Sequence, residues 1–356
     1  MQQMNTQRRL AFFLILAFLG MYSGLDAQIG GREVYNFMRL SSSARISGLG
    51  GNLITVRDDD VSLAFDNPAS LNPEVSGALT FQHSFFFDGI QHGYFGYGQH
   101  IEKWKTTLHG GIKYIDYGSF DYNDVNGNLQ GEFSAGEYAI AVGASHQVYE
   151  RLTIGANLKF IGSSMEVYNS VGLAGDVAAM FHDTASRTNI SLVFKNIGSQ
   201  LTPYNDEPLS KLPYDVQIGF SKKLKHLPFR FSIIYHHLHR FNILYDDPNA
   251  EEPGFFIGDA QPEEGNPWFD TFFRHFVFNG EFLFGKKENF RIRLGYNHLR
   301  HKELTPPNLR SLAGFSFGLG LKINRFRLDY GREIWHLAGG VNQIGISTNI
   351  NEFKKS

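Results

Sequence analysis

The sequence predicts an all-β fold, a fourteen-stranded antiparallel transmembrane β-barrel with an N-terminal hatch, or plug, in its lumen. Three observations predict this fold. The chain begins with an export signal and has no later membrane helix, its composition is rich in glycine and aromatic residues, and its hydrophobic pattern alternates over segments of about ten residues. Together they favour a barrel over a soluble β-sandwich.

Residues 1–27 have the pattern of a cleaved secretory signal peptide. Arg8 and Arg9 precede the apolar run Leu10–Leu19, and small and polar residues follow as far as Ala27. This run is far shorter than the roughly 20 residues that a spanning helix needs. No later apolar run reaches the roughly 18 residues expected of a transmembrane helix. The exported chain is therefore either soluble or a β-barrel.

The composition favours the barrel. The chain has 38 glycines, 33 phenylalanines and 16 tyrosines but no long apolar segment, as expected when an apolar face toward lipid alternates with a polar face toward a lumen. It contains no cysteine, which excludes disulfides, a lipoprotein anchor, zinc-thiolate sites and a cysteine nucleophile. The formal net charge of −2 gives no indication of a nucleic-acid partner.

Alternating segments of about ten residues, the length that a tilted strand needs to cross a bilayer, occupy the predicted barrel at 77–352. The clearest lie at 104–114, 137–148 and 152–160. The other expected strands start near Ala78, Gln91, Ser170, Asn189, Pro213, Phe229, Phe272, Phe290, Ser311, Phe326 and Leu337. The total of fourteen is even, as in bacterial single-chain outer-membrane barrels.

The expected connections give an independent indication, because such barrels have short periplasmic turns and longer external loops. The even-to-odd turns are short at 149–151, 224–228, 285–289 and 323–325. The longest odd-to-even connections are expected at 118–135, 199–212, 242–271 and 301–310. The lengths alternate in phase with the strand count, which a sandwich has no reason to do.

One of these connections contains Tyr245–Asp270, which is rich in proline and acidic residues and has embedded aromatics. Loops of this length usually carry a function. Two interpretations stay open, a folded surface that contacts a partner and a mobile, solvated tip.

The N-terminal segment 28–76 is expected to form the hatch. Asp58–Asp60 lack the alternating ligand spacing and the later glutamate of an EF-hand, so the pattern does not favour specific calcium binding. The stretch "DDDVSLAF" is typical of a cap followed by a short helix. Glycines and Pro68 suit tight turns in a confined space. The aspartates are expected to cap this helix or to meet basic lumen residues such as Arg291 and Arg293.

The sequence indicates no catalytic site, no metal site and no cofactor, and we do not expect an enzyme. It contains no GxSxG elbow and no phosphate loop ending in GK[ST]. In "HHLHR", alternation places His237 and His239 on one strand face and His236 on the other, and two histidines without a third ligand make a weak metal site. Charged residues on the polar parity of the strands are expected to pair in a hydrated lumen. A bound lipid or detergent-like ligand stays open.

The stretch "DDVSLAFDNPASL", Asp59–Leu71, resembles the N-terminal hatch of FadL-type outer-membrane proteins. The hatch motif consists of Asp59, Asp60, Asn67, Pro68 and Ala69. The resemblance implies a fourteen-stranded barrel with its hatch in the lumen, in agreement with the count from alternation. It also implies transport of long-chain fatty acids or other hydrophobic molecules as one function, through an apolar pocket between hatch and wall. The residues that would line such a pocket, or else simply pack the hatch, are Phe37, Met38, Leu40, Leu53 and Phe65.

A narrower resemblance covers essentially the whole mature chain. Gly30–Gly51, Phe87–Gly98 and Asn342–Ile350 are similar to the PorQ family of the type IX secretion system, a FadL-like family related to PorV. The stretch "RLSSSAR" departs from the opening of PorV-like chains. The chain ends "NEFKKS" without a terminal phenylalanine, so its barrel-assembly signal is either Phe353 or a variant.

That resemblance implies an outer-membrane component that binds protein and performs no chemistry. Such barrels hold a PorZ-like surface protein of the cargo attachment complex at the cell exterior. The expected partners are this protein and outer-membrane lipid, with no nucleic acid. The expected contacts are aromatic anchors of the kind that dominate interfaces, namely Phe255, Phe256, Trp268 and Phe269.

Overall fold

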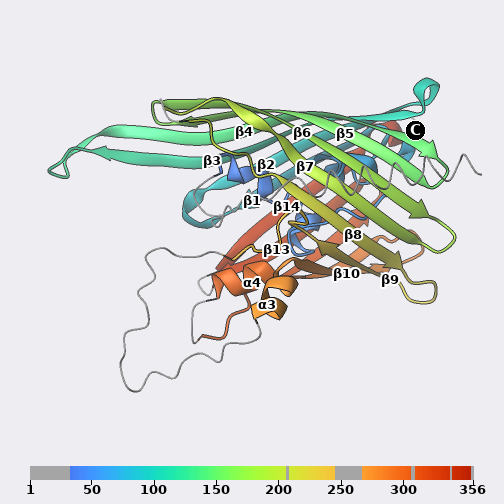
Figure 1. The fold of residues 1–356 in the computed structure, drawn as a ribbon. Coiled ribbons are helices and arrows are strands. Elements are labelled where there is room, and N and C mark those ends of the chain that lie inside the picture. The colour runs from blue at the N-terminus through green and yellow to red at the C-terminus, as the bar shows by residue number, and fades with distance from the viewer. Residues whose placement is uncertain (1–32, 206–207, 245–266, 306–308, 337–338, 354–356) are drawn as a thin grey trace, which may run out of the picture.

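The structure, a computed structural model, describes residues 33–205, 208–244, 267–305, 309–336 and 339–353. The predicted signal peptide and the predicted partner residues Phe255 and Phe256 lie outside the described residues. Fourteen strands close into one antiparallel barrel, in which consecutive strands pair with each other and β1 pairs with β14 (Figure 1). The predicted fold class is confirmed. The strands are β1 (Ala78–Phe85), β2 (Gln91–Ile101), β3 (Thr106–Asn123), β4 (Leu129–Tyr149), β5 (Leu152–Met165), β6 (Tyr168–Asp183), β7 (Thr188–Thr202), β8 (Asp215–Lys223), β9 (Phe229–Tyr235), β10 (Phe276–Phe284), β11 (Phe290–Asn297), β12 (Phe315–Ile323), β13 (Phe326–His336) and β14 (Gly339–Asn349).

Alternation along each strand sorts its side chains between the lumen and the outside. In β5, Asn157 and Lys159 are buried inside, whereas Ile154 and Leu158 point outward and are 46% and 53% exposed. Exposed phenylalanine, leucine and isoleucine side chains occur in the same way on strands around the whole wall. An apolar outer face of this kind contacts lipid, so the chain forms a transmembrane barrel of the outer-membrane type.

The two rims of the barrel differ in their connections. At one end, defined as the inner rim, short turns join β4 to β5, β8 to β9, β10 to β11 and β12 to β13, as predicted. The opposite end, the outer rim, carries the longer β7–β8, β9–β10 and β11–β12 connections. The last two contain α3 (Pro267–Arg274) and α4 (His298–Leu304). No helix in the part of the chain that the structure describes is long and apolar enough to cross a membrane.

Two expectations about the strands are wrong. Residues 118–135 do not form a loop, because β3 and β4 continue as a hairpin whose tight turn lies at 124–128. Cross-strand pairs such as Phe120 with Phe133 keep the ladder intact there. The strand expected near Phe272 begins only at Phe276, since Phe272 belongs to α3. Its aromatic run satisfies helical spacing as well as alternation, and the helix forms.

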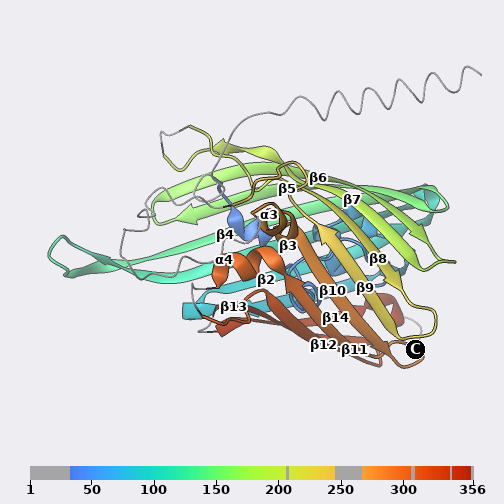
Figure 2. The ribbon, with the colours of Figure 1, turned by 60° about the horizontal axis from the view of Figure 1, so that its bottom comes forward.

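The hatch, defined as residues 33–77, runs through the lumen from the outer rim to the inner rim, inside the ring of strands (Figures 1 and 2). At the outer rim Glu33 forms a parallel bridge with Lys211 of the β7–β8 connection. At the inner rim the Gly77 amide donates to the Gly98 carbonyl of β2. Its helical turns are η1 (Asn36–Arg39), α2 (Ala44–Ser47), η2 (Val61–Phe65), η3 (Pro68–Ser70) and η4 (Pro73–Val75). The remaining short turns are η5 (Phe87–Gly89), η6 (Glu102–Trp104) and η7 (Ile350–Glu352).

Apolar packing holds the hatch at two levels. Residues of the hatch alone form one small core, which consists of Ile46, Leu49, Leu53, Val56 and Leu63. A second core joins Phe37, Met38 and Phe65 of the hatch to wall residues that include Tyr94 and Ile161. Because these side chains are almost fully buried, the hatch is an integral part of the barrel's interior.

Candidate functional site: the hatch and the outer surface

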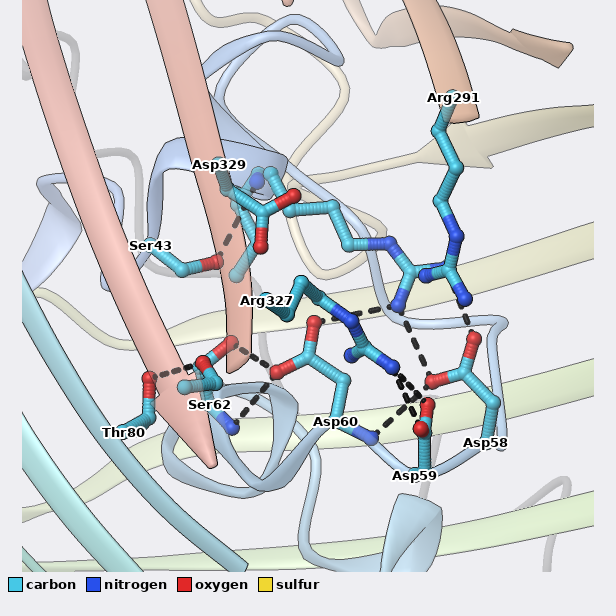
Figure 3. A network of polar contacts seen from close by, with 12 residues as sticks. Ser43, Asp58, Asp59, Asp60, Ser62, Thr80, Arg291, Arg327 and Asp329 are labelled. Atoms are coloured by element: carbon cyan, nitrogen blue, oxygen red, sulfur yellow. Dashed lines mark hydrogen bonds and ion pairs between the residues drawn. The ribbon is translucent and has the colours of Figure 1, made fainter. Parts of the chain in front are cut away.

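A cluster of ion pairs ties the middle of the hatch to the wall (Figure 3). Its centre is Arg45 on α2, whose side chain is 1% exposed. The two Nη atoms of Arg45 donate to both oxygens of Asp58 at 3.0 and 2.8 Å, and Nη1 also donates to Asp60 at 3.1 Å. On the opposite side, Nε and Nη2 donate to the two oxygens of Glu281 on β10 at 3.2 and 3.0 Å. One guanidinium thus joins two hatch carboxylates to one wall carboxylate in paired geometry.

The remaining aspartate of the run reaches a different strand. Asp59 accepts from Arg327 on β13 through both carboxylate oxygens, and Lys322 lies 3.6 Å away. The predicted partner Arg293 does not contact the aspartates. It instead joins Glu281 at 2.9 Å to Asp329 at 2.7 Å, behind the hatch.

The charges of the cluster nearly cancel among the described residues. Arg291, the other predicted partner, lies beside Asp58 in Figure 3. The cluster as a whole contains the basic residues Arg45, Arg230, Arg291, Arg293 and Arg327 and the acidic residues Asp58, Asp59, Asp60, Glu281 and Asp329. With Lys322 beside Asp59, six basic residues face five carboxylates, so the cluster carries little net charge.

Asp60 also has the capping role that the sequence predicts. It is the N-cap of η2, where its Oδ1 accepts from the Ser62 amide at 3.1 Å and from the Ser62 hydroxyl at 2.6 Å. Its Oδ2 meanwhile accepts from Arg45. The same carboxylate therefore starts the short helix and fixes it to the ion-pair cluster.

A second polar cluster holds the hatch against β3, β5 and β7. Lys195 pairs with Asp66 of the hatch at 2.7 Å, and Lys159 pairs with Asp176 at 2.7 Å. Lys113 donates to the backbone carbonyls of Met38 and Leu40. The Phe65 ring lies between Lys113 and Lys159, whose Nζ atoms are 4.9 and 4.4 Å from its centre.

The asparagine, proline and alanine of the hatch motif form a tight corner against the wall. Asn67 Oδ1 accepts from the Ala69 amide at 2.9 Å, and Pro68 begins η3 directly after this cap. Asn67 Nδ2 donates to the Ile54 carbonyl at 2.6 Å and to Ser191 of β7 at 2.9 Å. A Cβ atom on Gly155 of β5 would come within 2.5 Å of the Pro68 carbonyl carbon, so only glycine leaves room for this corner.

The apolar residues that transport would require are taken up by packing. Phe37, Met38 and Phe65 lie in the core shared with the wall, Leu40 packs against that core, and Leu53 lies in the hatch's own core. A cavity of about 440 Å³ opens at the outer mouth, and its lining is mostly apolar, with Glu33 and Glu137 as its two carboxylates. An apolar groove of about 390 Å³ lies on the lipid side of β4–β7, outside the lumen.

The most prominent outer feature is the projecting hairpin, defined as residues 118–135 of β3 and β4. The β2–β3 ladder ends at Asp116 and the β4–β5 ladder begins at Ala135, so beyond these points the two strands pair only with each other. Figure 1 shows the hairpin reaching far past the other strands. The rings of Phe120 and Phe133 stack with centres 5.3 Å apart. The hairpin carries three acidic residues and no basic one.

The second outer feature is the pair of helices α3 and α4. Asp270 of α3 contacts Arg274 at 2.7 Å on its own helix and Lys302 of α4 at 3.0 Å. Trp268 and Phe269, two of the predicted partner residues, are 53% and 54% exposed. Helix α3 therefore presents aromatic side chains outward, while the ion pair of Asp270 with Lys302 holds it against α4.

The histidine cluster does not follow the predicted strand alternation, because β9 ends at Tyr235. His237 adopts a left-handed backbone conformation with φ of 55°, which turns its ring toward His236. Sequence reasoning also missed two residues that organise these sites, Arg45 and Asp215. Arg45 lies only 13 positions before Asp58, and this proximity could have indicated an ion pair. Asp215 lies far from the histidines in the sequence and is brought to them only by the fold.

The chain matches no protein-family model, and no curated protein matches it. Among solved structures it is similar to the CymD monoaromatic hydrocarbon channel, with 12% identity over 87% of this chain and 96% of that one and a TM-score of 0.49. It is similar to a Pseudomonas aeruginosa FadL homologue, with 9% identity over 87% and 98% of the two chains and a TM-score of 0.49. It is also similar to the Pseudomonas putida toluene transporter TodX, with 9% identity over 86% and 96% and a TM-score of 0.46.

Proposed function

We propose that this barrel anchors a soluble partner protein at the cell surface and that its outer face, rather than its lumen, provides the binding surface. The observation that carries the proposal is the projecting hairpin. A two-stranded ribbon with both edges free is marginal in water and is a ready template for a further strand. Such edges recruit extended segments of other proteins by strand addition.

The closed lumen supports the same function. The hatch spans the barrel from rim to rim and is held by buried ion pairs on one side and an apolar core on the other. A rigid, plugged barrel suits an anchor, because binding a partner at the outer surface does not require the wall or the lumen to open.

The resemblance to the type IX secretion barrels supplies the class of partner. The proposed partner is a PorZ-like surface protein of the cargo attachment complex, bound by the projecting hairpin and by the aromatic side chains on α3. Acidic residues on the hairpin, Asp121, Asp124 and Glu132, favour a basic contact surface on this partner. The sequence-based expectation that Phe255 and Phe256 contact the partner stays a prediction, because both lie outside the described residues.

Substitution on the hairpin tests this function. We expect Phe120→Ser combined with Phe133→Ser to reduce the amount of surface partner that co-purifies with the barrel from outer membranes, because it removes the stacked aromatic pair. Leu309→Ser with Leu312→Ser is the matched control, since both leucines are exposed on the β11–β12 connection. The amount of barrel in the membrane is measured in parallel. Full retention of the partner by the hairpin variant would contradict the proposal.

A second candidate function, transport of hydrophobic molecules, is favoured by one feature of the wall. The β7–β8 ladder stops at the pair Lys195 and Asp215, so the outer part of β7 pairs only with β6. The β7–β8 connection covers this interval through side-chain contacts, such as the Ser210 amide donating to Gln200 at 2.9 Å. A passage from the outer mouth to the bilayer would open there.

A reversible crosslink distinguishes the two functions. The chain has no cysteine, so Gln200→Cys with Ser210→Cys would introduce the only pair. If transport is the function, oxidation should stop uptake of a labelled long-chain fatty acid and reduction should restore it. If anchoring is the function, oxidation should leave the partner bound, and uptake should equal that of cells lacking the barrel.

A further inference from the structure

Two histidines and an aspartate meet at the outer end of β8 and β9. Asp215 is the first residue of β8, and His236 and His237 follow directly after β9. One ligand atom from each of the three residues lies within 4.8 Å of the others. The Nδ1 atoms of His236 and His237 are only 2.6 Å apart. The fold thus adds the third ligand that the sequence pattern lacked.

Several polar atoms of this cluster have no partner. His236 is 5% exposed, and its Nε2 is buried without a hydrogen bond. The Nε2 of His237 is buried and unpaired as well. The two Nδ1 atoms lie between the ring centres, which are 4.8 Å apart, so the unpaired Nε2 atoms point away from the cluster and the candidate ligand atoms are the two Nδ1 atoms and a carboxylate oxygen of Asp215.

We propose that Asp215, His236 and His237 bind a divalent transition-metal ion of the zinc class. Imidazole nitrogens with one carboxylate are a donor set that such ions prefer, at roughly 2.0–2.2 Å per bond. Two nitrogens bound to one ion at these lengths are farther apart than 2.6 Å, so on binding the two Nδ1 atoms would separate and the Asp215 carboxylate would close on the ion. A water molecule would take the fourth position on the side of His237, which is the less buried of the two histidines.

Neighbouring groups already hold the ligands in place. Gln217 Nε2 donates to Asp215 Oδ2 at 2.7 Å, and the His237 amide donates to Asp215 Oδ1 at 2.7 Å. The His236 carbonyl is contacted by Nδ1 of His275 at 2.8 Å. Such outer contacts orient metal ligands and raise their affinity. Arg39, whose positive charge acts on both histidines, is paired with Glu33 at 2.7 Å.

The position of the site suggests what the ion does. The β8–β9 ladder begins only at Ile218, so Asp215 lies beyond its end. The β7–β8 ladder also ends at Asp215. An ion held by Asp215 and the two histidines would tie the end of β8 to the start of the long β9–β10 connection, at the point where the wall has the fewest strand hydrogen bonds.

Metal binding to the full chain tests the site. The protein is purified without a polyhistidine tag, stripped with chelator and titrated with Zn²⁺ by calorimetry. We expect one ion per chain, and a loss of affinity of tenfold or more in Asp215→Asn and in His236→Gln with His237→Gln. His226→Gln, an exposed histidine at the inner end of the same strand pair, is the matched control and should bind as the unchanged chain does.

A second readout guards against variants that fail to fold. Co²⁺ bound to the unchanged protein should give the strong visible absorption of a four-coordinate site, which His237→Gln alone should abolish. Folding of each variant is checked by its heat-dependent mobility in detergent gels. Absence of saturable Zn²⁺ binding to the unchanged protein, or equal binding by a folded variant lacking both histidines, would overturn the proposal.

Discussion

At the scale of single residues, the hatch depends on a few buried groups whose partners lie far away in the sequence. Arg45 contacts Asp58 and Asp60 in the hatch and Glu281 in the wall. Removing one partner of a buried ion pair destabilises the fold by much more than the pair contributes to stability, because the remaining charges stay buried without compensation. The fixed position of the hatch therefore rests on individual side chains.

Replacing Arg45 with methionine should destabilise the barrel strongly. The change leaves three carboxylates without their central cation, and we expect a loss of roughly 3–5 kcal/mol. Unfolding in urea, followed by detergent-gel mobility, measures this loss. Arg310→Met, at an exposed arginine of the β11–β12 connection, should leave the unfolding midpoint unchanged. Equal midpoints for the two variants would show that the cluster does not hold the hatch.

Gly155→Ala should displace the corner at Pro68. The new methyl group would lie 2.5 Å from the Pro68 carbonyl carbon, and overpacking of this kind costs about 1–3 kcal/mol. The matched control is Gly110→Ala, in the neighbouring part of the wall, where an added Cβ meets nothing within 4 Å. Thermal unfolding of both variants measures the difference. A Gly155→Ala midpoint no lower than that of Gly110→Ala would refute close contact between corner and wall.

At the scale of elements, two outer structures have few contacts that stabilise them. The projecting hairpin has a ladder on only one side of each strand. Helices α3 and α4 are too short to be stable alone, and ion pairs of Asp270 hold them together. Elements of this kind unfold locally at a low free-energy cost, as expected for a surface that binds a partner.

The contact between α3 and α4 should depend on acid pH. Burial alone would raise the pKa of Asp270, but hydrogen bonds from Arg274 and Lys302 outweigh it and lower the pKa below its usual value. Its stabilising contribution is therefore complete above the ordinary aspartate pKa of about 4 and is lost as the pH falls through the lower folded value. Fluorescence of Trp268 should report the loosening on acidification. Asp270→Asn should remove this transition, and an unaltered transition in that variant would assign it to another group.

At the scale of the whole molecule, the barrel is a closed cylinder filled by its own N-terminal segment. The wall supplies every arginine of the ion-pair cluster except Arg45, the hatch supplies most of the aspartates, and the two parts neutralise each other inside. The packed hatch blocks the middle of the lumen. Permeability is therefore controlled by how firmly the hatch is held.

Replacing Asp59 and Asp60 with alanine should make the barrel leaky. The double variant frees Arg327 and removes the cap of η2, so we expect single-channel conductance in planar bilayers to rise above that of the unchanged barrel. Asp121→Ala with Asp124→Ala on the projecting hairpin removes the same charge outside the lumen and is the control. Unchanged conductance together with loss of a bound calcium ion would instead favour a metal role for these aspartates.

The number and order of the strands could be predicted from the sequence, because alternation repeats along the chain and needs no distant partner. The cap at Asp60 and the corner at Asn67 and Pro68 are local for the same reason. The sequence could not show that 118–135 remains a hairpin or that Phe272 lies in a helix. In 118–135 the pairing of β3 with β4 decides, and at Phe272 the aromatic run satisfies helical spacing as well as alternation, so local patterns do not settle either segment.

The sequence by itself determined the alternating wall, the closing segment and its turns, since each follows from interactions among residues close together in the chain. Only the tertiary structure decided which charges pair. Arg45 and Glu281 meet across 236 positions of sequence, and Asp215 reaches the histidines only because the end of β8 lies beside the end of β9. Partner choice inside a barrel is a matter of strand register and of the path of the hatch, and neither is fixed until the sheet closes on itself.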